Sequence, residues 1–315
     1  MKKSIAKRFM ACFMAAAMAS SMTAFVSAAD SAPAEEKERV LLTKAGVSEV
    51  DVTYTPERGT VEIYLLKPVK NLRTKVQISL TSNKDAKAAY NYDINPDGNP
   101  ELFPLQLGDG EYAIKVLIQS AKEPAKWAVA QTANYTLKLE DDKAPFLNAN
   151  QFVNYNNDSK VVIKAKDLTK KAKTDLERVD AIFNYVIGAL EYDTKKATTV
   201  QTGYIPDINA VIDSKKGICF DYAVVFAAML RSVDIPCKLI MGYVQNNGQA
   251  IYHAWNEFYL KDKGGWFKVN EMKYNVESKT FERIDPTLVS SNKNATKNTF
   301  QFIGDGTNYT FDKQY

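Results

Sequence analysis

Two residues of this sequence have types and positions suited to nucleophilic catalysis, Cys219 and His253. Cys219 stands in the run KGICFDYA, residues 216–223, where a glycine-containing loop is expected to turn into a helix. A thiol at a helix N-terminus meets the positive end of the helix dipole and several unpaired N–H groups, and both favour the thiolate. The same N–H groups can stabilise the oxyanion of a tetrahedral intermediate.

His253 is the only histidine of the chain, so any step that uses an imidazole must use this residue. It begins the run HAWNEFY, whose alternation predicts a strand with His253, Trp255, Glu257 and Tyr259 on one face. A cysteine at a helix start and a histidine on a strand can act together, because Cys–His activation requires proximity in space and not in sequence. Taken singly, each residue is also compatible with a structural role.

A disulfide between Cys219 and Cys237 is disfavoured by the expected local geometry. A helix from Cys219 to about Ser232 carries the chain roughly 20 Å away. The five residues that follow would have to run straight back at about 3.3 Å each. We therefore expect Cys219 to be a free thiol. The remaining cysteine, Cys12, lies in the N-terminal segment discussed below.

Hydrophobic periodicity predicts the helices and strands on which Cys219 and His253 lie. Apolar residues at three- and four-residue steps predict a helix over 176–190, preceded by a capping box of Thr174 and Glu177. A second helix is predicted from Cys219 to Ser232, ending before Pro236. Strands are predicted at 238–244, 253–260, 266–269 and 281–284. The region 160–315 is thus expected to be an α+β domain, with helices first and an antiparallel sheet after them.

The preceding region has a different pattern. Alternating apolar residues separated by Gly and Pro predict strands at 50–55, 60–66, 75–80, 89–94, 112–118 and 127–139. This spacing is typical of a β-sandwich of immunoglobulin or fibronectin-III type, which we place at residues 40–145. It contains no His and no Cys. The polar stretches 140–143 and 148–159 are the expected linker.

The N-terminal 29 residues have the pattern of a secretory signal peptide. Four basic residues in the first eight are followed by an apolar stretch and by the small residues Ser27, Ala28 and Ala29. Of the 41 basic and 37 acidic residues, 37 of each sign remain after removal of this leader. A neutral mature chain gives no electrostatic reason to expect binding to nucleic acid or to an anionic membrane. We expect a secreted protein that is extracellular or associated with the cell wall.

Several short motifs occur together in a characteristic order. They are Gly217–Ala223 around the cysteine, Met229–Ser232, Ile235-Pro236, Gly242-Tyr243, the run from His253 to Glu257, and Asp285-Pro286-Thr287. From Thr174 to Tyr315 the chain resembles the transglutaminase-like superfamily, whose members have a papain-like core. The resemblance implies that Cys219 is the nucleophile, that His253 is the general base and acid, and that Asp285 orients the imidazole.

The third member of this triad has an alternative in Asn270. Many relatives place the aspartate shortly after a tryptophan, and the matching offset from Trp266 falls on Asn270. Asparagine holds the imidazole in papain-type enzymes, so Asn270 can fill the role. Asp285 is favoured because it carries the tripeptide usual in the family.

The function that this resemblance implies is thiol-dependent acyl transfer on peptide or amide carbonyls of a protein or peptide substrate, as a protease, an amidase or a transglutaminase. Hydrolysis is favoured, because the chain shows no acid cluster of the kind that calcium-dependent crosslinkers use. We expect no cofactor and no metal, since one histidine and two separated cysteines cannot assemble a zinc site. Tyr204, on the loop before Cys219, is a candidate for lining the cleft or donating to an oxyanion. The alternative is a catalytically inactive cell-surface binding or adhesion protein of the same fold.

Overall fold

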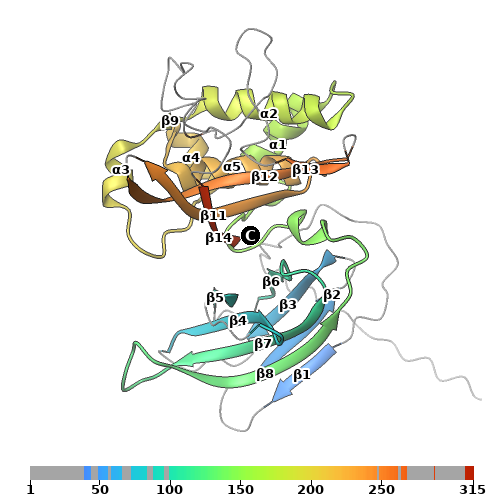
Figure 1. Cartoon of the computed structure of the whole chain (residues 1–315), viewed down its shortest axis with the longest axis vertical. Coiled ribbons are helices and arrows are strands. Elements are labelled where there is room, and N and C mark those ends of the chain that lie inside the picture. The colour runs from blue at the N-terminus through green and yellow to red at the C-terminus, as the bar shows by residue number, and fades with distance from the viewer. Residues whose placement is uncertain are drawn as a thin grey trace, which may run out of the picture.

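The computed structural model of the chain describes residues 39–43, 49–55, 58–65, 72–83, 88–95, 99–246, 248–261, 264–267, 287 and 309–315. The expected signal peptide, Asn270 and Asp285 lie outside the described residues. Among the described residues, each half of the chain has a large hydrophobic core of its own. Figure 1 shows the two halves as distinct bodies, with the C-terminal end of the chain between them. In the part of the chain described, no helix is long and apolar enough to cross a bilayer.

The N-terminal half consists of two four-stranded antiparallel sheets with the orders β1-β2-β3-β6 and β5-β4-β7-β8. Its strands are β1 (Arg39–Thr43), β2 (Glu49–Thr55), β3 (Thr60–Leu65), β4 (Thr74–Leu80), β5 (Tyr90–Ile94), β6 (Glu101–Pro104), β7 (Gly110–Gln119) and β8 (Trp127–Leu137). The six strands expected from the alternation are present, and β1 and β6 were not predicted. Val61 and Ile63 of the first sheet share one core with Val76 and Ile114 of the second.

A tyrosine fixes the connection that enters β7. The Tyr112 hydroxyl lies 3.0 Å from the carbonyl oxygen of Leu105 and 2.8 Å from that of Gly108, and it accepts a hydrogen bond from the Leu107 N–H at 3.0 Å. Tyr112 itself is completely buried. One hydroxyl at the start of the strand thus contacts three backbone polar groups of this loop.

The C-terminal half places helices on one face of an antiparallel sheet of order β13-β12-β11-β14. The helices are α1 (Lys160–Thr169), α2 (Asp175–Ala189), α3 (Thr194–Thr199), α4 (Ile208–Ser214) and α5 (Cys219–Arg231). The strands are β11 (Cys237–Asn246), β12 (Gln249–Leu260), β13 (Gly265–Phe267) and β14 (Tyr309–Gln314), with a short parallel pair of β9 (Glu191–Tyr192) and β10 (Lys216–Gly217). The expected α+β arrangement is confirmed. The strand expected at 281–284 lies outside the described residues.

The buried helix of this half is α5. Every residue from Asp221 to Arg231 is buried, because α2 and α1 pack on one side of α5 and the sheet packs on the other. The predicted cap of α2 is also present, since the Thr174 hydroxyl accepts a hydrogen bond from the Glu177 N–H at 3.2 Å. The Glu177 carboxylate accepts from the N–H of Lys173, one residue before the position that the capping box predicts.

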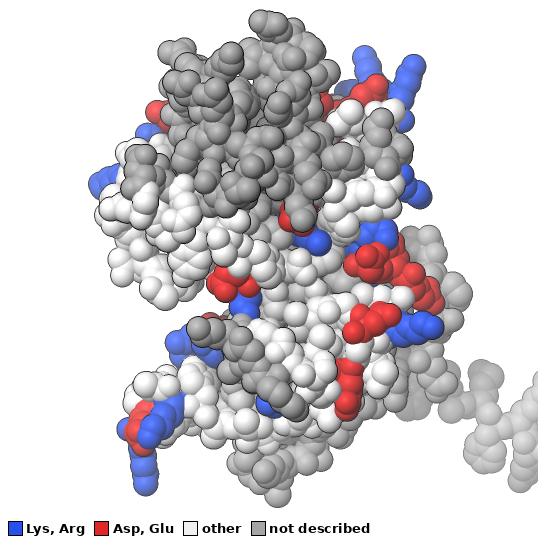
Figure 2. Space-filling model, in the orientation of Figure 1, with Lys and Arg blue, Asp and Glu red and all other residues white. Residues whose placement is uncertain are grey.

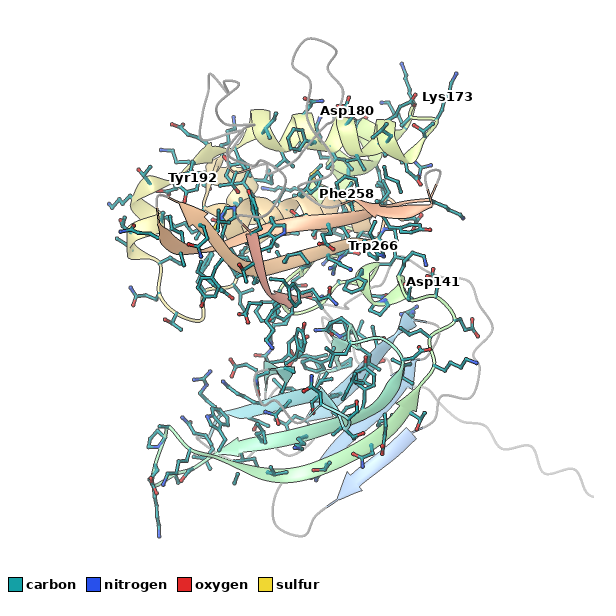
Figure 3. The ribbon with its side chains drawn as sticks, viewed as in Figure 1. Asp141, Lys173, Asp180, Tyr192, Phe258 and Trp266 are labelled. Carbon is teal, nitrogen blue, oxygen red and sulfur yellow. The ribbon has the colours of Figure 1, made fainter. Side chains whose placement is uncertain are left out.

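The stretch expected as a linker is packed between the two halves. A short 3-10 helix, η3 (Ala144–Phe146), lies between its two polar parts, and Phe146 contacts Trp266 of β13 with ring centres 5.5 Å apart. Figure 3 shows Trp266 on the side of the sheet toward η3 and Phe258 on the side toward the helices. Tyr315 closes the junction, with its ring 4.2 Å from Phe152 and 5.4 Å from Tyr90. On the face shown in Figure 2, acidic and basic side chains are interspersed.

Candidate active site at the start of helix α5

Cys219 is the first residue of α5, as the sequence predicts. Ile218 before it is extended, with φ −99° and ψ 178°, and its carbonyl accepts a hydrogen bond from the Tyr222 N–H at 3.1 Å. The N–H groups of the first helical turn have no acceptor within the helix. The thiol therefore lies beside backbone donors and at the positive end of a 13-residue helix.

The two cysteines in the described part of the chain are both free thiols, so the prediction that Cys219 and Cys237 are not disulfide-bonded is confirmed. They differ in accessibility. Cys237 is completely buried at the start of β11, and this burial raises the pKa of its thiol to about 12. Cys219 is only partly buried. Of the two, Cys219 is the thiol that a substrate can reach.

The orientation of α5 on the sheet brings Cys219 toward the end of β12 that contains His253. The Asn256 side-chain amide donates to the carbonyl oxygen of Ala223 at 3.0 Å, and two residues further along β12 Phe258 meets Phe226 with ring centres 6.2 Å apart. Helix and strand thus run in the same direction. Cys219 precedes Ala223 by one turn, and His253 precedes Asn256 by three residues, so both residues lie at the same end.

His253 is placed among aromatic rings. Its imidazole lies 6.2 Å from the Trp255 ring in a stacked arrangement and 6.3 Å from the Tyr309 ring. These side chains leave the sheet on one face, whereas Ala254 and Asn256 face α5. The alternation of β12 therefore places the His253 side chain on the face of the sheet opposite to α5.

Gly242 lies directly opposite His253 in the β11–β12 register. A Cβ atom at this position would lie 2.2 Å from the carbonyl oxygen of Thr310 and 2.7 Å from the Trp255 ring. Glycine is therefore required for β14 and Trp255 to come this close. The third member of the expected triad cannot be placed, because Asp285 and its alternative Asn270 both lie outside the described residues. Thr287 of the tripeptide is buried.

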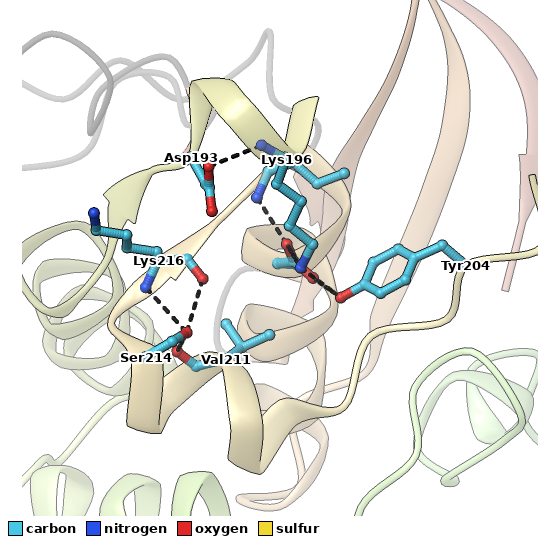
Figure 4. Close-up of polar contacts among 8 residues, drawn as sticks. Asp193, Lys196, Tyr204, Val211, Ser214 and Lys216 are labelled. Atoms are coloured by element: carbon cyan, nitrogen blue, oxygen red, sulfur yellow. Dashed lines mark hydrogen bonds and ion pairs between the residues drawn. The ribbon is translucent and has the colours of Figure 1, made fainter. Parts of the chain in front are cut away.

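A polar network that the sequence analysis missed lies beneath Cys219. Asp221, which is completely buried, accepts hydrogen bonds from the Ile218 N–H at 2.7 Å, from the Lys196 ammonium at 2.7 Å and from the Tyr204 hydroxyl at 2.6 Å. Figure 4 shows the side chains of Lys196 and Tyr204 pointing toward one another, with their polar contacts as dashed lines. The sequence does hold a signal, because an acidic residue in a helix that is apolar on all sides must find partners.

Tyr204 also accepts a hydrogen bond from the Lys196 ammonium at 2.6 Å. Burial, and then the hydrogen bond and negative charge of Asp221, raise the pKa of Tyr204 well above its usual value. The phenol is therefore neutral, and its single proton is donated to Asp221. No proton remains for an oxyanion in this arrangement, which argues against that role for Tyr204.

Other candidate sites are few in the described part of the chain. That part contains no group of three or more His, Cys, Asp or Glu residues arranged to hold a metal ion. A cavity of about 300 Å³ lies between the two halves, lined by Glu101, Asn150, Tyr155 and Ile205 among others. The residues that line it do not include Cys219 or His253, so the cavity is separate from the candidate active site.

Comparison with protein families gives a match within the C-terminal half. Residues 164–271 match the transglutaminase-like superfamily. This region is a transglutaminase-like domain. The match contains Cys219, His253 and Asn270 and ends before Asp285.

Relatives of the transglutaminase-like domain include the kyphoscoliosis peptidases. The human protein is 32% identical over 112 residues, which are 33% of this chain and 16% of the relative, and the mouse protein is 31% identical over the same length. The chain thus spans about a sixth of the length of these relatives.

Two solved structures have a distant likeness to the chain. A candidate cysteine protease from Cytophaga hutchinsonii has a TM-score of 0.40 at 12% identity, covering 81% of this chain and 79% of that one. Red sea bream transglutaminase has a TM-score of 0.32 at 12% identity, covering 78% of this chain and 53% of that one. The assignment of the transglutaminase-like domain rests on the sequence matches.

Proposed function

We propose that this chain is a thiol-dependent acyl-transfer enzyme with Cys219 as nucleophile, His253 as general base and acid, and Asp285 as the residue that orients the imidazole. The observation that carries the proposal is the position of Cys219. It is a partly buried free thiol at the first position of a long buried helix, and this helix is anchored to β12 near the sole histidine.

The reaction that this arrangement supports begins with attack of the Cys219 thiolate on a peptide or amide carbonyl carbon. The first-turn N–H groups of α5 stabilise the oxyanion of the tetrahedral intermediate. His253 protonates the leaving amine as the C–N bond breaks, which leaves a thioester on Cys219. Attack of water on the thioester then gives hydrolysis, and attack of a primary amine gives transamidation. We favour hydrolysis.

We further propose that residues 1–29 are a cleaved signal peptide and that the mature protein acts on an extracellular or cell-wall protein or peptide. The N-terminal half is proposed to be a β-sandwich of immunoglobulin or fibronectin-III type. The support for this is Tyr112, because a buried tyrosine at the start of a late strand that bonds to the backbone a few residues upstream is a feature of such domains. We propose that this domain docks the substrate or acts as a spacer for the C-terminal half.

The experiment that tests the proposal is brief treatment of the mature protein with iodoacetamide at about pH 6, followed by mass spectrometry. An ordinary thiol is almost entirely protonated at this pH. We expect one rapid adduct on Cys219, which is absent from Cys219→Ala. The matched control is Cys237→Ala, which should be labelled like the wild type because Cys237 is buried.

A screen of peptides, with and without a fluorescent primary amine, then separates hydrolysis from transamidation. Release of a free carboxylate without amine incorporation supports hydrolysis. If the folded wild-type protein gives no adduct at Cys219, the enzyme proposal fails and a binding or adhesion role takes its place.

A further inference from the structure

The network beneath Cys219 places a full negative charge in the same helical turn as the candidate nucleophile. Asp221 is the third residue of α5 and Cys219 is the first. The Asp221 side chain has no exposure to solvent, so water does not screen its charge. A buried anion two residues away in the same helix disfavours a second anion on the cysteine. It also offsets the positive end of the helix dipole, which would otherwise favour the thiolate.

The structure supplies a compensating cation from another element. Lys196 belongs to α3, and its ammonium lies 2.7 Å from Asp221 while only 26% of its side chain is exposed. The Lys196 ammonium also lies over the Tyr204 ring, with Nζ 4.3 Å from the ring centre. Asp193 anchors the backbone of α3 by accepting from the Lys196 N–H at 2.8 Å. The ammonium is therefore held over the carboxylate by backbone and side-chain contacts together.

Tyr204 completes the arrangement without adding charge. Its neutral hydroxyl donates to one carboxylate oxygen of Asp221, and Lys196 binds the other. Asp207, on the same segment as Tyr204, is a further charge whose influence reaches this phenol. The Ile218 N–H also donates to Asp221, so this carboxylate ties the residue before the nucleophile to the helix.

We propose that Lys196 is a positioning residue for the reaction: it neutralises Asp221, so that this carboxylate can fix the Ile218–Cys219 backbone without suppressing the Cys219 thiolate. This inference rests on the proposed role of Cys219. Lys196 acts through Asp221 and does not touch the substrate.

The test compares the alkylation rate of Cys219 by iodoacetamide, from pH 6 to pH 10, in a set of charge variants. Lys196→Met leaves the buried carboxylate uncompensated, and we expect its rate at pH 6 to fall by about tenfold, which is the loss of thiolate that a like charge causes when it moves the ionisation of a thiol by about one pH unit. The difference should shrink toward pH 10, where thiols are ionised in both proteins. Lys196→Arg keeps the charge and should stay within about threefold of the wild type.

The double variant Lys196→Met/Asp221→Asn removes both charges and keeps an acceptor for the Ile218 N–H. We expect it to regain most of the wild-type alkylation rate at pH 6. If Lys196→Met alone does not fold, the double variant still tests the role of the two charges. Lys160→Met is the control, because Lys160 pairs with Asp213 at a site where both side chains are more than half exposed. It should react like the wild type.

Two results overturn the inference while the proposed function stands. One is a folded Lys196→Met that reacts at pH 6 as the wild type does. The other is a double variant that folds, as judged by circular dichroism, and reacts as slowly as Lys196→Met or more slowly. A wild-type protein whose Cys219 does not react at all contradicts the proposed function itself.

Discussion

The ammonium of Lys196 lies 2.7 Å from a carboxylate oxygen of Asp221, although 25 residues separate them in sequence. Because Asp221 also binds the Ile218 N–H, this contact joins α3 to the start of α5, where the candidate nucleophile lies. The contact is an ion pair that also links α3 to α5, and its contribution to the free energy of unfolding can be measured.

Replacement of Asp221 by alanine should destabilise the protein by about 3 kcal/mol. Removing one partner of a buried ion pair typically costs about 3–5 kcal/mol, and the partial exposure of Lys196 reduces this cost. The Ile218 N–H and the Tyr204 hydroxyl also lose their acceptor. The free energy of unfolding in urea measures the effect.

The matched control is Asp213→Ala, which breaks the exposed pair with Lys160. Exposed pairs contribute about 0–1 kcal/mol, so this variant should unfold nearly as the wild type does. Equal losses for Asp213→Ala and Asp221→Ala would show that burial adds nothing to the Lys196–Asp221 pair.

Replacement of Gly242 by alanine should lower activity and cost about 1–3 kcal/mol of stability, which is the usual cost of overpacking. The added methyl group would overlap the Thr310 carbonyl oxygen and the Trp255 ring, so β14 or Trp255 has to move beside His253. Gly188→Ala on α2 is the control. A Cβ atom there meets nothing within 4 Å, and alanine should stabilise the helix by roughly 0.5–1 kcal/mol. Urea unfolding and peptide turnover of both variants check this prediction.

Stability should fall as the pH rises above about 9, partly because of Cys237. Burial raises the pKa of this thiol from 9.0 to about 12, so the folded state holds a proton that the unfolded chain releases. The stabilisation is fully present below pH 9 and is lost at about 1.4 kcal/mol per pH unit between 9 and 12. Urea unfolding between pH 8 and 11 should show a shallower decline for Cys237→Ala than for the wild type. If the free energy of unfolding fell equally with pH in the two proteins, Cys237 would not be the source of the decline.

Asp285→Ala should reduce turnover by a factor on the order of 10³ or more, because an imidazole without its carboxylate partner adopts the wrong tautomer and orientation. Asn270→Ala should retain turnover within about tenfold. Initial rates on the best peptide of the screen provide the comparison, with circular dichroism as a check of folding. If Asn270→Ala lost more turnover than Asp285→Ala, the orienting role would belong to Asn270.

The sequence was sufficient to predict the elements whose signals are local. The start of α5 at Cys219, the cap at Thr174 and the strand that contains His253 all follow from patterns within about ten residues. The partners of Asp221 did not follow, since Lys196 and Tyr204 lie 25 and 17 residues away and their contacts depend on how α3 packs. β14 was also missed, because it is a short strand far in sequence from β11, with which it pairs.

At its C-terminal end, α5 is anchored by Arg231, a buried residue whose guanidinium donates to the carbonyl oxygens of Asn148 at 2.7 Å and Tyr315 at 2.6 Å. Asn148 lies in the segment between the two halves, and Tyr315 packs on Tyr90 of the N-terminal half. The helix is a stiff rod about 20 Å long, with Cys219 at its opposite end. Arg231 thus fixes the far end of the helix that begins with Cys219 to the junction of the two halves, so the placement of α5 depends on that junction as well as on the sheet beneath it.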